Sequence, residues 1–504
     1  MSKAYQRPKV AVIGAGFAGL RCADVLLQGG VDVTVFEARN RIGGRVFQVS
    51  LEGQLYDVGA NWIHEPNENP LMDIAKDTNT FVCPRPFGVA LVDSSGRSRS
   101  IPYAERLKTT IDDLFDRASE YSYQHSAAID PRLSIMDYVR DRVTEEFKGQ
   151  PEFMQDLHRE AERRGMWDGD PTSSLSLKHQ CLEKGPGGID VFVSGTYKNI
   201  VSQVAKPALE KGVVQLGQKV NRIIYQDDSS PAKVMVETSS GTQESFDEVV
   251  VTCPLGWLKK HRTSFFVPEL PPPLSQAIDN ISFGRLEKIY LTFPLAFWLS
   301  RGQDQQSTGS IDGYPCVTHF HHPSYVKNQI PYPANQMIVS LTHLLQGHTQ
   351  PTILFYIHGP YATQLVHTIK GLEPHGDEYN NVLETYTKPF YSRLPNYAIN
   401  DPACKPRSYY CSTWQLDDLA GNGSYSNFQI GQADAAKDVA ILRDAGVLNR
   451  MKGVWFAGEH VAPACRQATT VGAYISGERV AENICKKWDM VLKRVSQGQP
   501  LAHI

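Results

Sequence analysis

Three glycines close to the N-terminus have the spacing of a phosphate-binding turn. Gly14, Gly16 and Gly19 lie between an apolar run and the start of a helical pattern. The first would permit a tight turn, the second would let the backbone approach a pyrophosphate, and the third would let the helix pack closely on a strand. The free N–H groups of the helix N-terminus, at Phe17 and Ala18, favour the same anion. The spacing therefore predicts a dinucleotide site.

The segments on either side of the glycines would position them. Residues 10–13 are apolar, as in a buried parallel strand, and residues 17–27 have a helical pattern. A second strand, over residues 31–36, ends at Glu37, whose carboxylate can accept hydrogen bonds from a ribose diol. A glycine-rich loop in an unrelated α/β protein would lack this agreement. We therefore predict a βαβ dinucleotide unit, with Ala38 at its edge.

A loop rich in arginine and glycine follows the acid almost directly. Arg39, Gly43, Gly44 and Arg45 would bring two adjacent glycines and two guanidinium groups back toward the phosphates. A solvated basic loop is the alternative interpretation.

A second strand–loop–helix unit lies near the C-terminus. Residues 453–457 predict a strand that runs into Gly458 and Glu459, and a helix with small residues at its start follows from residue 471. The N-terminus of such a helix can point at an electron-rich ring edge. The two units lie at opposite ends of the chain and fit one cofactor.

Both units resemble those of the flavin-containing amine oxidases, in the branch of the polyamine oxidases and lysine-specific histone demethylases. Residues 39–45 resemble the RxGGR extension of these flavoproteins, and residues 456–459 with the following helix resemble their FAGE…GA…SG segment. Residues 57–64, 247–258 and 282–291 resemble three further blocks, so the resemblance covers nearly the whole chain. The length leaves no room for the coiled-coil arm of the histone demethylase, which favours a polyamine-oxidase-like enzyme.

The resemblance implies FAD as the cofactor. Ser424 stands where the monoamine oxidases attach FAD through a cysteine, so we expect non-covalent binding. Glu459 is expected at the ribityl chain, Val220 at the adenine, and Thr470 and Val471 at the pyrimidine ring. The full set of expected cofactor contacts is Gly14, Gly16, Phe17, Ala18, Gly19, Glu37, Ala38, Arg39, Gly43, Gly44, Arg45, Gly59, Ala60, Asn61, Trp62, Val220, Trp414, Gly458, Glu459, Thr469, Thr470, Val471 and Ala473.

The resemblance also implies four residues at the reacting centre. Lys288 leads into an apolar strand, where a lysine is unusual, and would hold a water against flavin N5. A salt bridge between strands is the alternative for this lysine. Trp414 and Tyr425 would form one wall of an aromatic cage that orients an amine, and His64 would lie at the mouth of the substrate tunnel. Thr469 replaces the tyrosine of the opposite wall, which would open the cage to a bulkier amine.

These residues predict an amine oxidase acting on a secondary amine or polyamine. A hydride would pass from a C–N carbon to flavin N5, O2 would reoxidise the flavin to give H2O2, and the imine would hydrolyse to an aldehyde. Glu65 and Glu68 could attract a distal ammonium, or belong to a solvated loop. The alternatives are an L-amino-acid oxidase, with Arg285 or Arg466 as a carboxylate clamp, an oxidase of an alkaloid-like amine, and a catalytically silent flavoprotein.

The expected fold class is α/β, with a doubly wound, Rossmann-like FAD-binding domain interwoven with a mixed-sheet α+β substrate domain. Helices are expected over residues 111–122 and 135–142. FAD-binding segments are expected over residues 5–84, 186–275 and 396–490, substrate-domain segments over 85–185 and 276–395, and a tail over 491–504.

Charge and cysteine usage bound the setting in which the protein works. The net charge is -3, and no apolar run approaches the roughly 20 residues of a membrane span, so neither nucleic acid nor a membrane is expected as a partner. The nine cysteines form no CxxC pair and no signal peptide precedes them, which favours a cytoplasmic protein. Ala502-His503-Ile504 is a poor peroxisomal tripeptide. We expect a monomer or homodimer that meets a small amine and O2.

Three histidines raise the question of a metal. His319, His321 and His322 lie close together in the polar segment over residues 301–350. No cluster of cysteines or carboxylates completes a site around them, so we expect no metal and a surface loop beside a strand.

Overall fold

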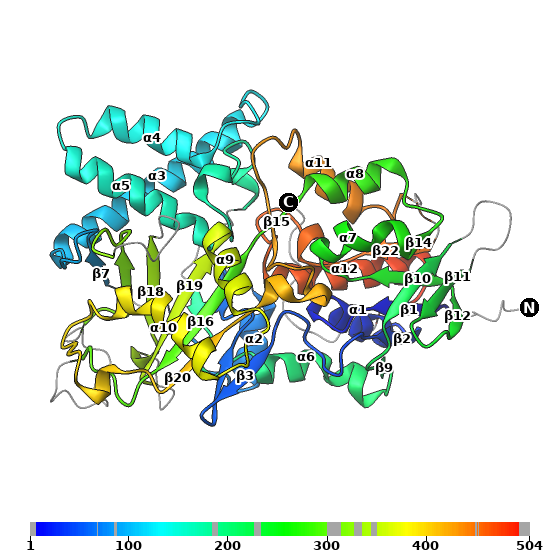
Figure 1. The fold of residues 1–504 in the computed structure, drawn as a ribbon. Coiled ribbons are helices and arrows are strands. Elements are labelled where there is room, and N and C mark those ends of the chain that lie inside the picture. Colours follow the sequence, from blue (N-terminus) through cyan, green and yellow to red (C-terminus); the bar gives the residue numbers. More distant parts are fainter. Residues whose placement is uncertain are drawn as a thin grey trace, which may run out of the picture.

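The computed structural model describes residues 7–67, 69–84, 88–183, 190–225, 233–299, 314–326, 335–343, 350–448, 451 and 453–492. Two halves lie side by side, one built on a parallel sheet and the other on a mixed sheet (Figure 1). Glu68, most of the segment 301–350 and the C-terminal tripeptide lie outside the described residues.

A five-stranded parallel sheet carries the glycine turn. Its strands are β1 (Lys9–Ile13), β2 (Asp32–Phe36), β9 (Val214–Gln215), β13 (Glu248–Val251) and β22 (Val454–Phe456). The order is β22-β13-β1-β2-β9, and every neighbouring pair is parallel. The strands come from three distant parts of the chain, so the sheet is complete only when both ends of the chain meet.

Helices cover both faces of this sheet. They are α1 (Phe17–Gln28), α6 (Lys198–Glu210), α7 (Leu255–Phe265), α8 (Pro272–Asn280), α11 (Ala435–Arg443) and α12 (Thr470–Lys487). Val10 and Val12 of β1 pack with α1, α6 and α12, whereas Ala11 and Ile13 pack with α7, α8 and α11, because successive side chains of a strand point to opposite faces. Burial on both faces explains why the strand sequences are continuous apolar runs.

A four-stranded sheet packs against the second of these faces. It contains β10 (Val220–Ile224), β11 (Val234–Thr238), β12 (Gln243–Phe246) and β14 (Phe266–Val267), in the order β12-β11-β10-β14. The chain therefore runs from β10 through β11 and β12 back into β13 of the parallel sheet.

The other half is built on a six-stranded sheet. Its strands are β7 (Val89–Val92), β16 (Leu286–Thr292), β17 (Val317–Phe320), β18 (Gln336–Ser340), β19 (Thr352–His358) and β20 (Ser408–Cys411). The order is β20-β16-β19-β18-β17-β7, with antiparallel pairing except between β17 and β7. Strand β16 brings Lys288 opposite Tyr356 of β19.

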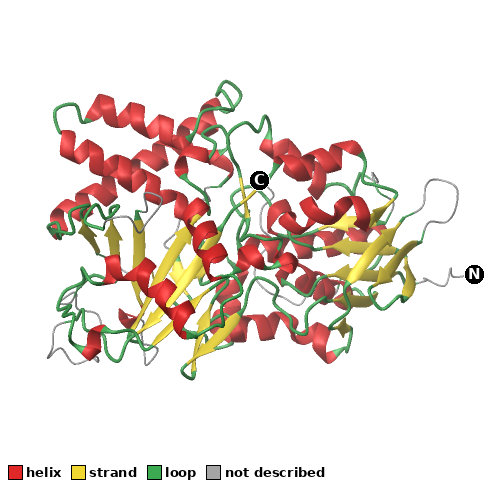
Figure 2. Ribbon diagram, viewed as in Figure 1, coloured by secondary structure: helices red, strands yellow, loops and turns green. Residues whose placement is uncertain are grey.

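Two groups of helices cover this sheet (Figure 2). The first group, α9 (Gly359–Ile369) and α10 (Asp377–Tyr391), buries an aromatic face of the sheet. The second group is α3 (Ile101–His125), α4 (Ile135–Glu146) and α5 (Pro151–Arg164), which share an apolar cluster with Leu91 of β7. The helices predicted over residues 111–122 and 135–142 are the central part of α3 and the first part of α4.

Short strands connect the two halves. They are β3 (Gln48–Leu51) with β4 (Gln54–Asp57), β5 (Trp62–Ile63) with β8 (Val191–Phe192) and β6 (Cys83–Pro84), and β15 (Ser282–Phe283) with β21 (Ser426–Asn427), and the helix α2 (Pro70–Asp77) follows β5. Trp62, Tyr356 and Trp414 share one apolar cluster at this junction. The predicted fold class, a doubly wound parallel domain interwoven with a mixed-sheet domain, is confirmed.

The expectation of a surface loop at the histidines is wrong for His319 and His321. His319 belongs to β17, and both side chains are buried. His319 Nδ1 lies 2.9 Å from Glu160 Oε2, and His321 Nδ1 lies 3.2 Å from Asp156 Oδ1. Both acids come from α5, which no sequence pattern connects to the histidines, and their charges make burial of the imidazoles tolerable.

In the described ranges, no group of three or more His, Cys, Asp or Glu side chains is arranged to hold a metal ion. None of the helices in the described part of the chain combines the length and the apolar character that crossing a bilayer requires.

Candidate cofactor and substrate site

A cavity of about 600 Å³ joins the two halves of the molecule. The residues that follow the parallel strands line one part of it, namely Gly14 after β1, Glu37 after β2, Thr252 after β13 and Gly458 after β22. The carboxyl ends of parallel strands are where open α/β sheets bind ligands. Residues of the six-stranded sheet, including Lys288, line the other part of the same cavity.

The glycine turn leaves its backbone open to the cavity. Gly14 has a φ of +110°, and a Cβ there would lie 2.6 Å from Thr252 Oγ1. A Cβ on Gly16 would meet no atom within 4 Å, so this position faces open space. A Cβ on Gly19 would lie 1.9 Å from the Gly14 carbonyl oxygen, which confirms that this glycine permits close packing of α1. Gly19 itself does not line the cavity.

The Glu37 side chain, at the end of β2, is fixed by backbone hydrogen bonds. Its side chain is 7% exposed. One carboxylate oxygen accepts a hydrogen bond from the Ala15 N–H at 2.8 Å, and the other accepts one from the Arg39 N–H at 2.8 Å. Arg39 forms a forked ion pair with Asp417, with both contacts at 2.8 Å. The carboxylate therefore stays ordered and keeps free lone pairs for a ribose diol.

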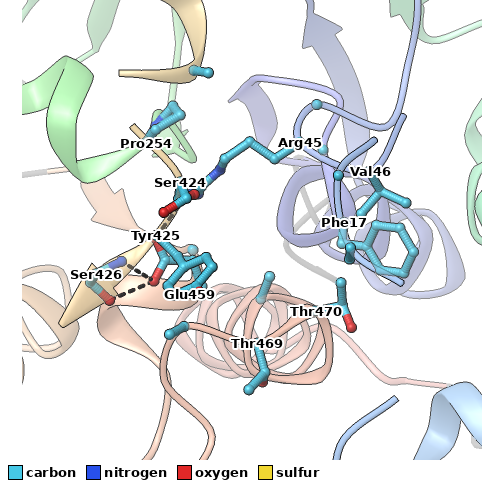
Figure 3. Close-up of a pocket in the computed structure, with 18 of the residues that line it drawn as sticks. Phe17, Arg45, Val46, Pro254, Ser424, Tyr425, Ser426, Glu459, Thr469 and Thr470 are labelled. Carbon is cyan, nitrogen blue, oxygen red and sulfur yellow. Dashed lines mark hydrogen bonds and ion pairs between the residues drawn. The ribbon is translucent and has the colours of Figure 1, made fainter. Parts of the chain in front are cut away.

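An ion pair joins the two sequence motifs (Figure 3). Arg45 Nη1 donates to Glu459 Oε1 at 2.9 Å and to the Ser424 carbonyl oxygen at 2.7 Å. The Ser426 hydroxyl donates to the other Glu459 oxygen at 2.5 Å. Burial opposes the charge of Glu459, but Arg45 and these hydrogen bonds outweigh it and lower the pKa of this carboxyl.

The start of α12 also borders the cavity. Thr469 caps the helix, because its hydroxyl accepts from the Gly472 N–H at 2.9 Å and donates to the Arg466 carbonyl at 2.7 Å. Thr469, Thr470 and Ala473 line the cavity. Val471 does not line it, because its side chain packs in the core beside α1.

Lys288 is 5% exposed and lies at the far wall of the cavity. Its Nζ contacts the Gly59 carbonyl oxygen and Asn61 Oδ1. Burial lowers the pKa of this amine well below that of an ordinary lysine, although the Asp57 and Glu287 carboxylates oppose the shift. The salt bridge between strands that was the alternative for this lysine is missing from the described contacts of its Nζ.

Aromatic side chains surround the same wall. Trp414 Nε1 donates to the Val58 carbonyl at 2.9 Å, and the Tyr425 hydroxyl donates to the Trp167 carbonyl at 2.7 Å. Trp62 Nε1 donates to the Tyr356 hydroxyl at 2.9 Å. Sequence reasoning missed Trp167 and Tyr356, which also line the cavity. The position of Tyr356, opposite Lys288 on the neighbouring strand, could have been indicated only once the strand register was known.

Carboxylates form part of the lining that sequence reasoning missed. Asp168, Glu183 and Asp190 line the cavity. Burial raises the pKa of Asp168, and burial together with the nearby Asp168 charge raises the pKa of Glu183. Asp190 Oδ2 lies 3.2 Å from His64 Nδ1, and both residues border the cavity.

Three further charged residues, Glu65, Arg285 and Arg466, form ion pairs within the chain. Arg466 Nη1 lies 3.0 Å from Glu65 Oε2, so Glu65 is not the free anion that was considered for a distal ammonium. Arg285 Nη2 lies 2.6 Å from Asp170 Oδ1. Both candidate carboxylate clamps are thus neutralised by acids of the chain itself.

The residues present fit FAD. An open turn at the N-terminus of α1, a preorganised acid after β2 and the start of α12 border one continuous cavity whose volume falls in the range of cofactor sites. The adenine end would lie near Val220, which also lines the cavity, and the reactive ring near Lys288.

Comparison with known proteins agrees with this geometry. Rice (Oryza sativa subsp. japonica) polyamine oxidase 4 is 26% identical over 97% of this chain and 90% of its own length. The bovine (Bos taurus) peroxisomal N(1)-acetyl-spermine/spermidine oxidase is 26% identical over 96% of this chain and 95% of its own. The rice lysine-specific histone demethylase 1 homolog 1 is 28% identical over 98% of this chain, which spans only 54% of that relative's length.

Solved structures extend the likeness to the fold. Wild-type putrescine oxidase bound to putrescine matches with a TM-score of 0.65 and 20% identity, over 95% of this chain and 99% of that chain. The model of the family described as flavin containing amine oxidoreductase matches residues 17–485. The chain therefore belongs to the flavin-containing amine oxidoreductases and is an FAD-dependent amine oxidase.

Proposed function

We propose that this enzyme oxidises a secondary amine or a polyamine at a carbon bonded to nitrogen, with O2 as the final acceptor. FAD, when bound, supplies the acceptor for the hydride and passes its electrons to O2, which gives H2O2. The oxidised substrate is an imine, and addition of water splits it into an aldehyde and an amine. The observation that carries this proposal is one cavity that joins the dinucleotide turn to Lys288, the aromatic wall and three carboxylates.

The cavity lining suits a cationic substrate. Asp168, Glu183 and Asp190 line the cavity, and an ammonium group beside the first two would favour the charged forms that burial disfavours. The faces of Trp414 and Tyr425 would hold the carbon chain. The nitrogen beside the reacting carbon has to be neutral, because its lone pair stabilises the positive charge that develops on that carbon. Charged groups are therefore expected to bind the distal end of the substrate, and the aromatic wall the reacting end.

Lys288 would serve the reacting end. With a lowered pKa, its amine can hold a water molecule by a hydrogen bond and can take up or release a proton near neutral pH. Such a water is needed for hydrolysis of the imine. His64, at the rim beside Asp190, would meet the substrate on entry.

The pairing of arginines argues against an amino-acid substrate. A carboxylate clamp needs a guanidinium group with free N–H donors facing the ligand. Arg285 and Arg466 form ion pairs with Asp170 and Glu65, and neither arginine lines the cavity. This observation favours an amine over an L-amino acid.

An anaerobic titration tests the proposal. The purified holoenzyme is mixed with spermine, spermidine, their N-acetyl forms, simple monoamines, an N-methyl-lysine peptide and L-amino acids, and the flavin absorbance is followed. We expect rapid bleaching by a member of the polyamine group. Bleaching only by an amino acid, or by no member while FAD is present, would contradict the proposal.

A further inference from the structure

Asn61 contacts the Lys288 nitrogen and is itself held by three further hydrogen bonds. Asn61 is 2% exposed and lies between β4 and β5, outside the sheet that carries the lysine. Its Oδ1 accepts from Lys288 Nζ and from the Tyr356 hydroxyl, the latter at 3.1 Å. Its Nδ2 donates to the Asp57 carbonyl and contacts the Tyr290 hydroxyl, both at 3.0 Å. All four hydrogen-bonding positions of the amide are therefore used.

Strand register explains why these groups converge. Lys288 and Tyr356 are opposite each other on β16 and β19, and Tyr290 is two residues beyond Lys288, so all three side chains point to the same face. Trp62 holds the Tyr356 hydroxyl from behind, and the Tyr290 hydroxyl also donates to the Asp57 carbonyl at 2.6 Å. The amide cannot turn over without breaking several of these contacts.

The arrangement limits what Lys288 can offer to the cavity. A lysine nitrogen has three positions besides its bond to Cε. The Gly59 carbonyl and Asn61 Oδ1 occupy two of them, and both accept hydrogen bonds. One position is left for the cavity that Lys288 lines. It carries a lone pair when the amine is neutral and a donor N–H when it is charged.

We propose that Asn61 is the positioning residue of Lys288: its locked amide oxygen directs the single free position of the lysine nitrogen into the cavity and sets how readily that nitrogen carries a proton. The inference deepens the proposed function, because it rests on the role given there to Lys288. Asn61 acts through the lysine and need not touch the substrate.

Other charged groups near the lysine define the background for this effect. The Asp57 and Glu287 carboxylates favour its charged form, and burial disfavours it. The Lys288 nitrogen lies 5.6 Å from the centre of the Tyr356 ring, and the Tyr290 hydroxyl is directed at the Asp57 carbonyl. Burial raises the pKa of Tyr356 and of Tyr290, so both phenols stay neutral as the lysine titrates. The neutral amide at position 61 adds no charge to this background and acts on the lysine through the acceptor that its oxygen supplies.

Two substitutions of similar shape should move the lysine in opposite directions. Asn61→Asp adds a negative charge at the same place, so the titration midpoint of Lys288 should rise by about one to three pH units. Asn61→Leu removes the acceptor and adds apolar surface, so the midpoint should fall. If Asn61 had only a structural role, the two substitutions would not shift the Lys288 titration midpoint in opposite directions.

The titration is read without turnover. The FAD-loaded protein is labelled with trace acetic anhydride across a pH series, and acetylation of Lys288 is measured by mass spectrometry. Tyr56→Phe is the matched control, because Tyr56 is a buried tyrosine of the same cluster whose hydroxyl contacts Thr352, 2.9 Å away, and not the lysine. Its midpoint should equal that of the wild type.

The outcomes separate this inference from the proposed function. Midpoints that stay unchanged, or move in the same direction in both Asn61 variants, would overturn the positioning role even if spermine bleaches the flavin. If no amine bleaches the flavin, the proposed function falls while the labelling result still stands. Should one variant fail to fold, the other decides, since each has its own expected sign.

Discussion

At the scale of single residues, loss of the Glu37 carboxylate should weaken the binding of FAD. Its carboxylate orders the turn through Ala15 and Arg39 and has lone pairs left for a ribose. Glu37→Gln should weaken FAD binding by about 1.5–3 kcal/mol, the value of hydrogen bonds to a charged group. The fraction of protein that retains FAD after gel filtration, and the dissociation constant on readdition, measure this.

Glu210→Ala is the control for that experiment, because this exposed glutamate at the end of α6 lies beside Lys206 of the same helix and does not line the cavity. Full retention of FAD by the Glu37 variant would mean that the ribose contact is misplaced.

Lys288 supports a different prediction, which concerns chemistry and not binding. Lys288→Met keeps the length and the apolar stem but removes the nitrogen, so FAD should stay bound while oxidative turnover falls by about a hundredfold or more. The pH dependence of kcat should also lose one limb. Because burial lowers the pKa of Lys288, that limb lies below the pH at which an ordinary lysine titrates. Steady-state kinetics across pH measure both effects, and unchanged turnover would remove Lys288 from the mechanism.

At the scale of elements, α1 and α12 pack against each other and both begin at the cavity. A Cβ on Gly477 would lie 2.0 Å from the Ala18 carbonyl oxygen and 3.0 Å from Ala18 Cα, and backbone cannot move aside as a side chain can. Gly477→Ala should therefore destabilise the fold by about 1–3 kcal/mol and reduce FAD retention, because both helix N-termini border the cavity. Denaturant unfolding measures the first effect. Lys486→Ala, at an exposed position of the same helix, should have neither effect, and wild-type behaviour of the Gly477 variant would refute the argument.

The histidine cluster between α5 and β17 gives a prediction about pH. Burial disfavours the charged form of His321, but hydrogen bonds and charges from Asp156 and Glu160 outweigh it and raise the pKa of this imidazole. A group whose pKa is raised by folding stabilises the protein below its unfolded pKa, about 6.5, and loses that contribution as pH rises through the folded value. The difference in unfolding free energy between wild type and His321→Gln should therefore be largest near pH 6 and shrink toward pH 9. A difference independent of pH would show that His321 is not charged in the fold.

Some elements of the site could be predicted from the sequence and others could not. Residues 10–37 hold a complete local pattern, so the strands, the helix and the glycine contacts of the first βαβ unit could be predicted from spacing. Trp167, Asp168 and Glu183 could not, because they line the cavity from short segments with no periodicity and meet the cofactor motifs only through the fold. The same holds for Glu160 and His319, which are far apart in sequence and pair through packing of α5 on the sheet. Local patterns therefore predict the cofactor motifs together with their charged residues, whereas long-range packing adds side chains such as Trp167, Asp168 and Glu183.

At the scale of the whole molecule, the cofactor site is a junction of distant segments. The cavity lining comes from the turn after β1, from β10, from the residues after β13 and from the start of α12, so FAD should bind only when both chain ends are folded together. A ligand that binds only the folded state stabilises it by about 2.7 kcal/mol when its free concentration is 100 times its Kd. Removal of FAD should therefore lower the melting temperature of the entire protein in one transition, and readdition of FAD should restore it.

The same experiment tests how the flavin is held. Ser424 offers no thiol, and its hydroxyl accepts from the Leu286 N–H at 3.1 Å. Acid precipitation should consequently leave a colourless pellet and free FAD in the supernatant. FMN, which lacks the adenine half, should raise the melting temperature of the apoprotein less than FAD does, because only FAD spans the cavity from Val220 to Lys288. Yellow colour that stays with the pellet would contradict non-covalent binding, and equal stabilisation by FMN would mean that the adenine end contributes nothing to joining the two chain ends.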